Sequence, residues 1–238
     1  MTNDYLTKKL IFAILLFQLN LEQHSTMKVE HLEYRWHQLM LRQQAPSRYI
    51  APLWREIRNA YTNTHRHYHN LHHLADLMTQ ADRFRTEIED FDTLEMSIWY
   101  HDIICQCLRK DNEEKSAIFA KYRMEAIQYP REKLVRCYQQ INATKTHQLT
   151  PEDDADTAWL LDFDLAILGS DWTVYAKYLD KIRKEYSIFP TFLYQRGRKK
   201  VLELLLNRKR LFHTPYYFDR FEATARENIQ RELALLAK

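Results

Sequence analysis

The stretch Arg66-His67-Tyr68-His69-Asn70-Leu71-His72-His73-Leu74-Ala75-Asp76-Leu77 holds the densest group of histidines in the chain. Five of the eleven histidines lie between His65 and His73. Because helical residues are about 100° apart, this spacing predicts a helix with two different faces. One face carries imidazoles and a carboxylate, from His69, His72, His73 and Asp76. The opposite face is apolar, with Leu71, Leu74, Ala75 and Met78. The pattern fits a helix that presents ligands, and it also fits an ordinary amphipathic helix with a solvated polar face.

Helical periodicity continues on both sides of this stretch, and no segment alternates as a strand does. Only two glycines are present, and Gly169 and Gly197 are too far apart to form a dinucleotide fingerprint or a P-loop. The sequence therefore predicts an all-α fold, an irregular helical bundle. Helices are expected over residues 28–44, 53–61, 70–84, 94–105, 112–128, 132–146, 158–168, 171–186, 189–212 and 218–236.

Composition is that of an ordinary globular protein. A length of 238 residues allows one domain or a small pair, and 45% hydrophobic residues support a substantial core. A net charge of +3 is too weak to predict nucleic-acid binding. Three cysteines form no paired zinc pattern and are a poor number for a disulfide framework. We therefore expect reduced thiols and a cytoplasmic protein.

The first residues of the chain allow another reading. Lys8–Lys9 precede the apolar run Leu10–Leu19, which is too short to span a bilayer and resembles the core of a signal peptide. No small-x-small cleavage site follows it, so an extra helix or a natural start at Met27 is preferred over secretion. We predict an N-terminal extension over residues 1–27 and a single helical domain over residues 28–238.

A His-Asp dipeptide lies on a stripe that faces the core. In the helix predicted after residue 93, His101 and Asp102 fall on or beside the positions of Leu94, Ile98 and Cys105. A carboxylate at such a position is costly unless it is paired or coordinated. A buried Asp–His hydrogen bond would explain the pair, and so would a metal site.

A later apolar segment carries two more aspartates. The segment 158–168 is apolar nearly all round, which predicts a central helix, and Asp162 and Asp164 lie within it. Salt bridges to arginine or lysine would satisfy these carboxylates. Taken together, however, the three segments supply two imidazoles and two carboxylates, a reasonable set of nitrogen and oxygen ligands for a divalent metal ion.

The order His … His-Asp … Asp on an all-α frame resembles the HD superfamily of metal-dependent phosphohydrolases. Residues 68–77 are similar to the YHNxxHxxDV signature of cyclic-nucleotide phosphodiesterases. The wider set of motifs resembles a bacterial group of predicted HD-type phosphohydrolases, from about Leu32 to the C-terminus. In chain order these motifs read YHNxxH, WYHD, DNEExSA, ATKTH, DxDLAILG and IRKEY. The resemblance implies an HD-domain-like bundle that hydrolyses a phosphomonoester or phosphodiester with metal-activated water, nucleotides being among the candidate substrates.

The resemblance also implies a role for each matching residue. The implied metal ligands are His73, His101, Asp102 and Asp164. Nitrogen and oxygen donors do not choose between Mn²⁺, Mg²⁺, Fe²⁺, Co²⁺ and Ni²⁺. His69 would protonate the leaving group, for which its ordinary pKa near 6.5 is suited. Asp162 remains the alternative to Asp164 as the fourth ligand.

Further residues are candidates for handling the substrate. We expect Glu113 to orient the attacking water, and Arg66 and Lys145 to bind phosphate oxygens, arginine being the better bidentate partner. His147 is a candidate for substrate binding or for a second metal, although a structural role at a helix end would also explain it. The chain departs from the phosphodiesterases over Ile103–Asp111, which contains no histidine. A complete second metal site is therefore not implied. The chain also has no recognisable purine-binding segment downstream, so cyclic-nucleotide substrates are not implied.

Other classes of function remain open. The main alternative is a non-catalytic HD-fold protein that binds a nucleotide or a partner as a regulator. A plain helical interaction protein and an HD-fold di-iron oxygenase are two more, and the oxygenase needs more histidine ligands than the sequence offers. We expect a small phosphorylated substrate, neither nucleic acid nor membrane as a partner, and a homo-oligomer as an open option.

Overall fold

The computed structural model of the chain describes residues 27–237, so the predicted N-terminal extension, Met27 apart, lies outside the described residues. Within residues 27–237 the chain forms α-helices and two short 3₁₀-helices and no strand, which confirms the all-α prediction. No helix of this part of the chain has both the length and the apolar composition needed to cross a bilayer. The α-helices are α2 (Leu32–Arg42), α3 (Ser47–Tyr61), α4 (Leu71–Arg83), α5 (Phe91–Tyr100), α6 (Asn112–Ala126), α7 (Arg131–Ala143), α8 (Ala155–Leu165), α9 (Trp172–Glu185), α10 (Thr191–Leu206) and α11 (Pro215–Leu236). The 3₁₀-helices are η1 (Val29–His31) and η2 (Ala166–Gly169).

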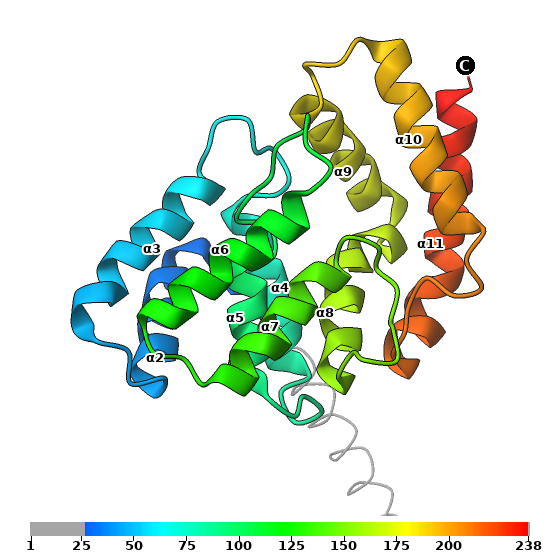
Figure 1. Cartoon of the computed structure of the whole chain (residues 1–238). Coiled ribbons are helices and arrows are strands. Elements are labelled where there is room, and N and C mark those ends of the chain that lie inside the picture. Colours follow the sequence, from blue (N-terminus) through cyan, green and yellow to red (C-terminus); the bar gives the residue numbers. More distant parts are fainter. Residues whose placement is uncertain (1–26, 238) are drawn as a thin grey trace, which may run out of the picture.

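Helix α5 lies at the centre of the bundle, with α4, α6, α7 and α8 packed around it (Figure 1). All of its residues except Asp92 are buried. Its sequence is apolar on nearly every side, which suits a helix enclosed by others. Trp99 packs edge-on against both Trp36 of α2 and Trp54 of α3. The N-terminal helices are thereby fixed to the centre through aromatic contacts.

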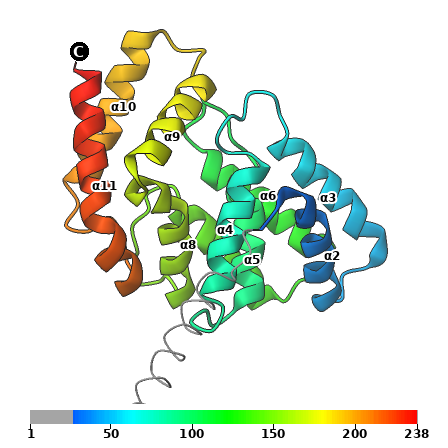
Figure 2. The same ribbon diagram turned by 180° about the vertical axis from the view of Figure 1, so that it is seen from behind.

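Helices α9, α10 and α11 stand together on one side of the molecule (Figures 1 and 2). Arg198 of α10 donates hydrogen bonds to both carboxylate oxygens of Glu232 on α11, at 2.7 and 3.0 Å. The hydroxyl of Tyr175 on α9 donates to the same carboxylate at 2.6 Å. One buried carboxylate thus joins the three helices, and it is compensated by a buried arginine as a buried charge requires.

Three helix boundaries differ by five or more residues from those expected from the sequence: the start of α3, the end of α5, and the end of α10, which lies at Leu206 instead of Phe212. Pro52 was expected in a loop but lies inside α3. This helix begins at Ser47, six residues before the start that the sequence predicted at Leu53. The proline lies near the start of the helix and costs it the single bond that its missing N–H would have donated to Arg48. Helix α5 ends at Tyr100, so the His-Asp dipeptide follows the helix instead of lying within it.

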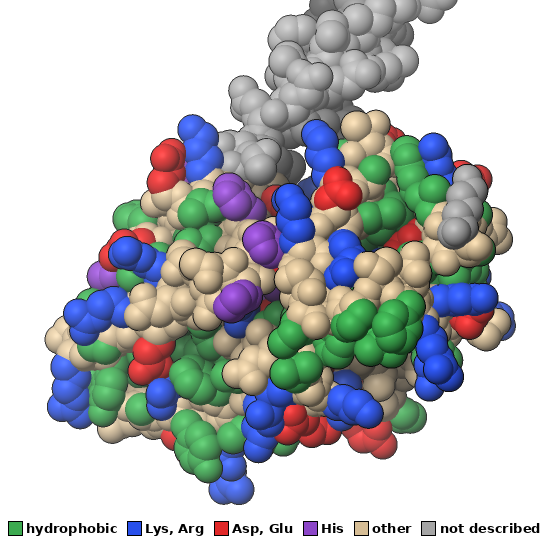
Figure 3. Space-filling view, turned by 90° about the horizontal axis from the view of Figure 1, so that it is seen from above, with side chains coloured by type: hydrophobic (Ala, Val, Ile, Leu, Met, Phe, Trp, Pro, Cys, Tyr) green, Lys and Arg blue, Asp and Glu red, His purple; other side chains and the backbone are tan. Residues whose placement is uncertain are grey.

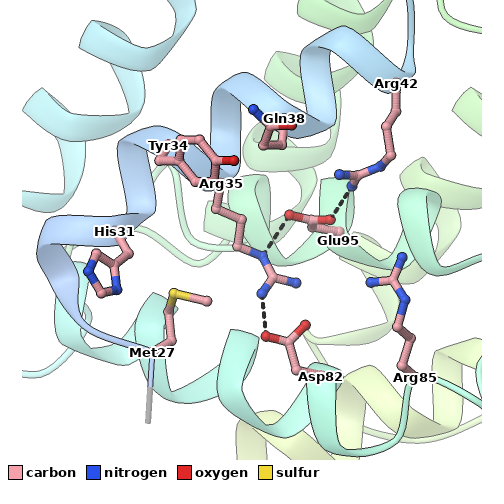
Figure 4. A pocket seen from close by; sticks show the side chains of 9 residues that line it. All are labelled: Met27, His31, Tyr34, Arg35, Gln38, Arg42, Asp82, Arg85 and Glu95. Carbon is pink, nitrogen blue, oxygen red and sulfur yellow. Dashed lines mark hydrogen bonds and ion pairs between the residues drawn. The ribbon is translucent and has the colours of Figure 1, made fainter. Parts of the chain in front are cut away.

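An ion-pair network joins α2 to α4 and α5 around a surface pocket of about 460 Å³ (Figure 4). The guanidinium of Arg35 donates to Glu95 at 2.7 Å and to Asp82 at 2.6 Å. Arg42 donates to the other oxygen of Glu95 at 2.7 Å. The side chain of Glu95 is only 1% exposed, so its charge depends on these two arginines.

Substituting Arg35 with methionine is expected to destabilise the fold by roughly 2–4 kcal/mol, because the buried carboxylate of Glu95 loses its more buried partner. Urea unfolding measured by circular dichroism gives the change. Arg42→Met is the matched control: its side chain is 38% exposed, and we expect a loss of about 1 kcal/mol or less. Equal losses in the two variants would contradict this account of the network.

Candidate metal centre

Three separate segments bring the predicted ligands to one point. His73 lies in the first turn of α4, which begins after Asn70, whose side chain accepts a hydrogen bond from the His72 N–H at 2.9 Å. His101 directly follows α5 and precedes Asp102. Asp164 lies in the last turn of α8. All four side chains lie at or next to the end of a helix, where the helical hydrogen bonds fix the backbone.

The interatomic distances within this cluster are short. The Nε2 atoms of His73 and His101 are 3.2 Å apart. Oδ2 of Asp102 lies 3.2 Å from His101 Nε2 and 3.8 Å from His73 Nε2. Oδ1 of Asp164 lies 3.2 Å from His73 Nε2 and 3.9 Å from His101 Nε2. Two ligand atoms about 2.1 Å from one ion lie roughly 3.0–3.4 Å apart at octahedral or tetrahedral angles, so three of these five distances fit without adjustment.

The tautomer of His101 is fixed by its backbone partner. Nδ1 of His101 lies 2.9 Å from the carbonyl oxygen of Ile98, which can only accept a hydrogen bond. The proton of the neutral ring is therefore on Nδ1, and the lone pair of Nε2 faces His73 and the carboxylates. This arrangement, in which a carbonyl orients the imidazole, is the usual one for histidines that bind metals.

The electrostatics of the cluster favour positive charge. Burial disfavours the imidazolium form of His101, but the negative charges of Asp102 and Asp164 outweigh burial and raise its pKa to about 9. Burial also works against the charged form of Asp102, yet His101 and His69 hold the pKa of this carboxyl well below its ordinary value. A group of donors that binds a proton this readily also attracts a cation, because protons and metal ions compete for the same lone pairs.

His69 and Glu185 form a second feature beside the cluster. Nδ1 of His69 donates to Glu185 Oε2 at 2.7 Å, and the backbone N–H groups of Tyr68 and His69 both donate to Oε1. Nε2 of His69 then lies 4.0 Å from Asp102 Oδ2. Burial lowers the pKa of His69, but the charge of Asp102 and hydrogen bonds to Cys105 and Glu185 raise it well above its ordinary value. His69 thus holds a proton on the side that faces the cluster.

From the sequence alone we expect Arg183 and Glu185 to form a structural pair, and that expectation gives Glu185 no role at the cluster. In the structure Arg183 donates to the carbonyl oxygens of Tyr186 and Phe189. Residues two apart on a helix do not face each other, so the helix geometry already disfavoured that pair. An acidic residue in the last turn of a helix is itself a signal, because the helix dipole disfavours it there unless a donor is close.

Arg66 lies beside the cluster but its guanidinium is largely engaged by the backbone. Nη1 donates to the carbonyl oxygens of His69 and Asp102 at 3.1 and 2.7 Å, and Nη2 donates to that of Ile103 at 2.9 Å. The guanidinium also stacks on the ring of Tyr61. Arg66 therefore holds the loop before α4 against the segment after α5, a different task from the phosphate binding that we expected of it.

His147 contacts the cluster through Asp164. Its Nε2 lies 2.7 Å from Asp164 Oδ2, the oxygen that faces away from His73. The backbone of His147 is in the left-handed region, with φ of 49°, and its carbonyl oxygen accepts a hydrogen bond from Arg208 at 3.1 Å. Through the contact of its Nε2 with Oδ2, His147 orients the carboxylate of Asp164.

The structure does not bring the remaining predicted residues to the cluster. Lys145 is paired with Glu114 at 2.6 Å on the surface. Glu113 lies half-buried in the first turn of α6, and within residues 27–237 no hydrogen bond or ion pair joins it to the cluster. Asp162 accepts hydrogen bonds from the N–H groups of His213 and Thr214, at the start of α11. Of the two aspartates considered as the fourth ligand, Asp164 is the one at the cluster.

Helix α4, which contains most of the histidine-rich stretch, has polar residues both on its solvent-facing side and in the core. His72 and Asp76 are exposed, whereas His73 is 3% exposed and His69 precedes the helix. The predicted single imidazole-rich face is therefore wrong, since His73 is buried in the core and His72, the other histidine of the helix, faces solvent. Figure 3 shows histidine side chains gathered on the surface seen from above, next to lysines and arginines.

The fold and the cluster define an all-α protein in which two histidines and two aspartates meet at a buried point next to a His–Glu pair. No family model, no curated protein and no solved structure matches the chain. Its short motifs shared with HD-type phosphohydrolases therefore support a proposal and do not establish membership.

Proposed function

We propose that the chain is an HD-type, metal-dependent phosphohydrolase that acts on a small phosphate ester, with nucleotides among the candidate substrates. The observation that carries the proposal is the meeting of His73, His101, Asp102 and Asp164 within 3.2–3.9 Å contacts, with His69 beside them. Neutral imidazole nitrogens and carboxylate oxygens are ligands that Mn²⁺, Fe²⁺, Co²⁺ and Ni²⁺ accept, and Mg²⁺ accepts the oxygens more readily than the nitrogens. The four residues thus fit a divalent cation by their chemistry.

A divalent cation held by these residues would lower the pKa of a water and polarise a phosphoryl oxygen. The residues of the chain supply the rest. Glu185 fixes the His69 ring through Nδ1 so that Nε2 faces Asp102, and the charged form of the ring carries a proton on this nitrogen. From there His69 can donate its proton to the departing oxygen of the ester. His147 orients Asp164, and Arg66 holds the backbone of His69 and Asp102 in place.

We extend the proposal to a cytoplasmic location. Cys105, Cys107 and Cys137 are all free, so no disulfide supports the fold. Free thiols are usual in reducing compartments.

The proposal is tested by purifying the full chain, measuring its bound metals by mass spectrometry, and assaying phosphomonoesters, phosphodiesters and nucleotides with added Mn²⁺. We expect bound metal and turnover of at least one ester, which EDTA abolishes and Mn²⁺ restores. EDTA is also expected to lower Tm by about 5–10 °C, because a cation at about 100 times its Kd adds about 2.7 kcal/mol. A protein without metal and without turnover would end the proposal. Nucleotide binding without turnover would favour the regulatory alternative.

A further inference from the structure

The outer face of α10 carries an apolar stripe that no other helix within residues 27–237 covers. Leu193, Val201 and Leu204 are each between 45% and 57% exposed. At about 100° per residue, these three positions and Gly197 fall within an arc of roughly 80°. The buried Leu202 lies on the opposite side of α10, and the buried Leu205 lies between it and the edge of the stripe at Val201. The stripe is therefore continuous along the helix, and contiguous apolar surfaces of this kind mark interaction sites more often than single exposed side chains do.

Gly197, in the middle of this stripe, has no explanation within the fold. The chain has only two glycines. At Gly169 an added Cβ would lie 2.6 Å from Phe221, so packing excludes a side chain there. At Gly197 an added Cβ would meet nothing within 4 Å. Glycine is the poorest helix former apart from proline, so its presence inside an exposed helix points to something outside the chain that approaches closely.

The flank of the stripe is basic. Arg196 and Lys200 are exposed on one side of it, and neither forms an ion pair with a carboxylate within residues 27–237. Lys199, further round the helix, is paired with Glu203 at 3.8 Å, and Glu203 is the sole acidic residue of α10. The surface beside the apolar stripe therefore attracts negative charge.

We infer that this face of α10, defined by Leu193, Gly197, Val201 and Leu204, docks an amphipathic helix whose apolar side is flanked by aspartate or glutamate. A helix can lay its apolar side along such a stripe, and a glycine at the crossing lets the two backbones approach. The acidic flank of the partner pairs with Arg196 and Lys200.

Two other occupants fit less well. In a symmetric contact with a second copy the same patch meets itself, which places Arg196 and Lys200 near their own counterparts. A bilayer surface is favoured by large apolar side chains, and it gains nothing from the missing side chain at Gly197. Both remain as outcomes of the test.

The test measures binding of the full chain to two fluorescent three-heptad peptides, with leucine at the a and d positions and either glutamate or lysine at e and g. We expect the acidic peptide to bind at least about tenfold more tightly than the basic one, with affinity falling as salt rises. Arg196→Glu/Lys200→Glu should reverse the preference. Gly197→Leu should weaken binding about tenfold or more while leaving Tm unchanged or higher, because the new side chain meets nothing in the fold.

Each alternative has its own signature. Binding that is absent, indifferent to peptide charge, or unchanged by Gly197→Leu would overturn the inference. A dimer in light scattering that Leu204→Ser dissociates would assign the face to a second copy. Sedimentation with anionic vesicles that Gly197→Leu strengthens would assign it to a membrane. The charge-reversal variant replaces exposed side chains only, so it keeps the test decisive if Gly197→Leu fails to fold.

Discussion

Asp102→Ala is expected to abolish metal retention and, with it, phosphate-ester hydrolysis. Oδ2 of Asp102 lies 3.2 Å from His101 Nε2 and 3.8 Å from His73 Nε2, within reach of an ion held by both histidines. Loss of a residue that merely orients a ligand typically costs 10–100-fold in metal affinity, so loss of a ligand should cost more than about 100-fold. The measurements are metal content after dialysis, kcat/KM with added Mn²⁺, and the effect of EDTA on Tm, which the variant should lose.

Asp162 and Asp164, two aspartates near the end of α8, provide a matched control for this prediction. Asp164→Ala should lose metal as Asp102→Ala does, because Oδ1 of Asp164 lies 3.2 Å from His73 Nε2. Asp162→Ala should retain metal and instead destabilise the fold by about 1–3 kcal/mol, since the N–H groups of His213 and Thr214 lose their acceptor. If Asp102→Ala or Asp164→Ala held as much metal as the unmodified chain, the assignment of ligands would be wrong.

The helices were predictable from the sequence because most have a regular apolar period and clear ends. Asn70 caps α4, and asparagine is one of the residues preferred at this position. Pro130 immediately precedes the first residue of α7. The start of α3 was not predictable in this way, since a proline early in a helix costs a single hydrogen bond and aromatic packing of Trp54 compensates it. The start of α3 therefore depends on tertiary contacts, which the periodicity of the sequence does not reveal.

The candidate ligands were named from the sequence for a different reason, the resemblance of the short motifs to HD-type phosphohydrolases. His101, Asp102 and Asp164 also place polar groups on otherwise apolar segments, and such groups need partners. Glu185 was missed because its partner His69 is 116 residues away in the chain. The task of Arg66 depends on carbonyl oxygens whose positions exist only in the folded chain. Residue type therefore predicted the groups that bear charge, but not the contacts that orient them.

His69→Asn is expected to lower kcat by roughly 10²–10⁴-fold on alkyl phosphate esters, the usual contribution of a positioned proton donor. The loss should be much smaller on p-nitrophenyl phosphate, since that leaving group departs without a proton. Metal content should not change, because His69 Nε2 lies 4.0 Å from Asp102 Oδ2 and is not one of the four ligands. Equal losses on both kinds of ester would contradict a role for His69 in protonating the leaving oxygen.

Glu185→Gln should reproduce part of this loss with the same dependence on the leaving group. The carboxylate accepts from His69 Nδ1 and from two backbone N–H groups, and it supports the charged form of the ring. Glutamine keeps the shape and the backbone contacts, but its neutral amide no longer supports the imidazolium, so proton donation to an alkoxide slows. Arg183→Met is the comparison, because Arg183 lies two residues away on the same helix and its hydrogen bonds within residues 27–237 go to Tyr186, Phe189 and Thr191, away from His69. A loss in Arg183→Met with the same leaving-group dependence would mean that the end of α9, and not the carboxylate, is what His69 requires.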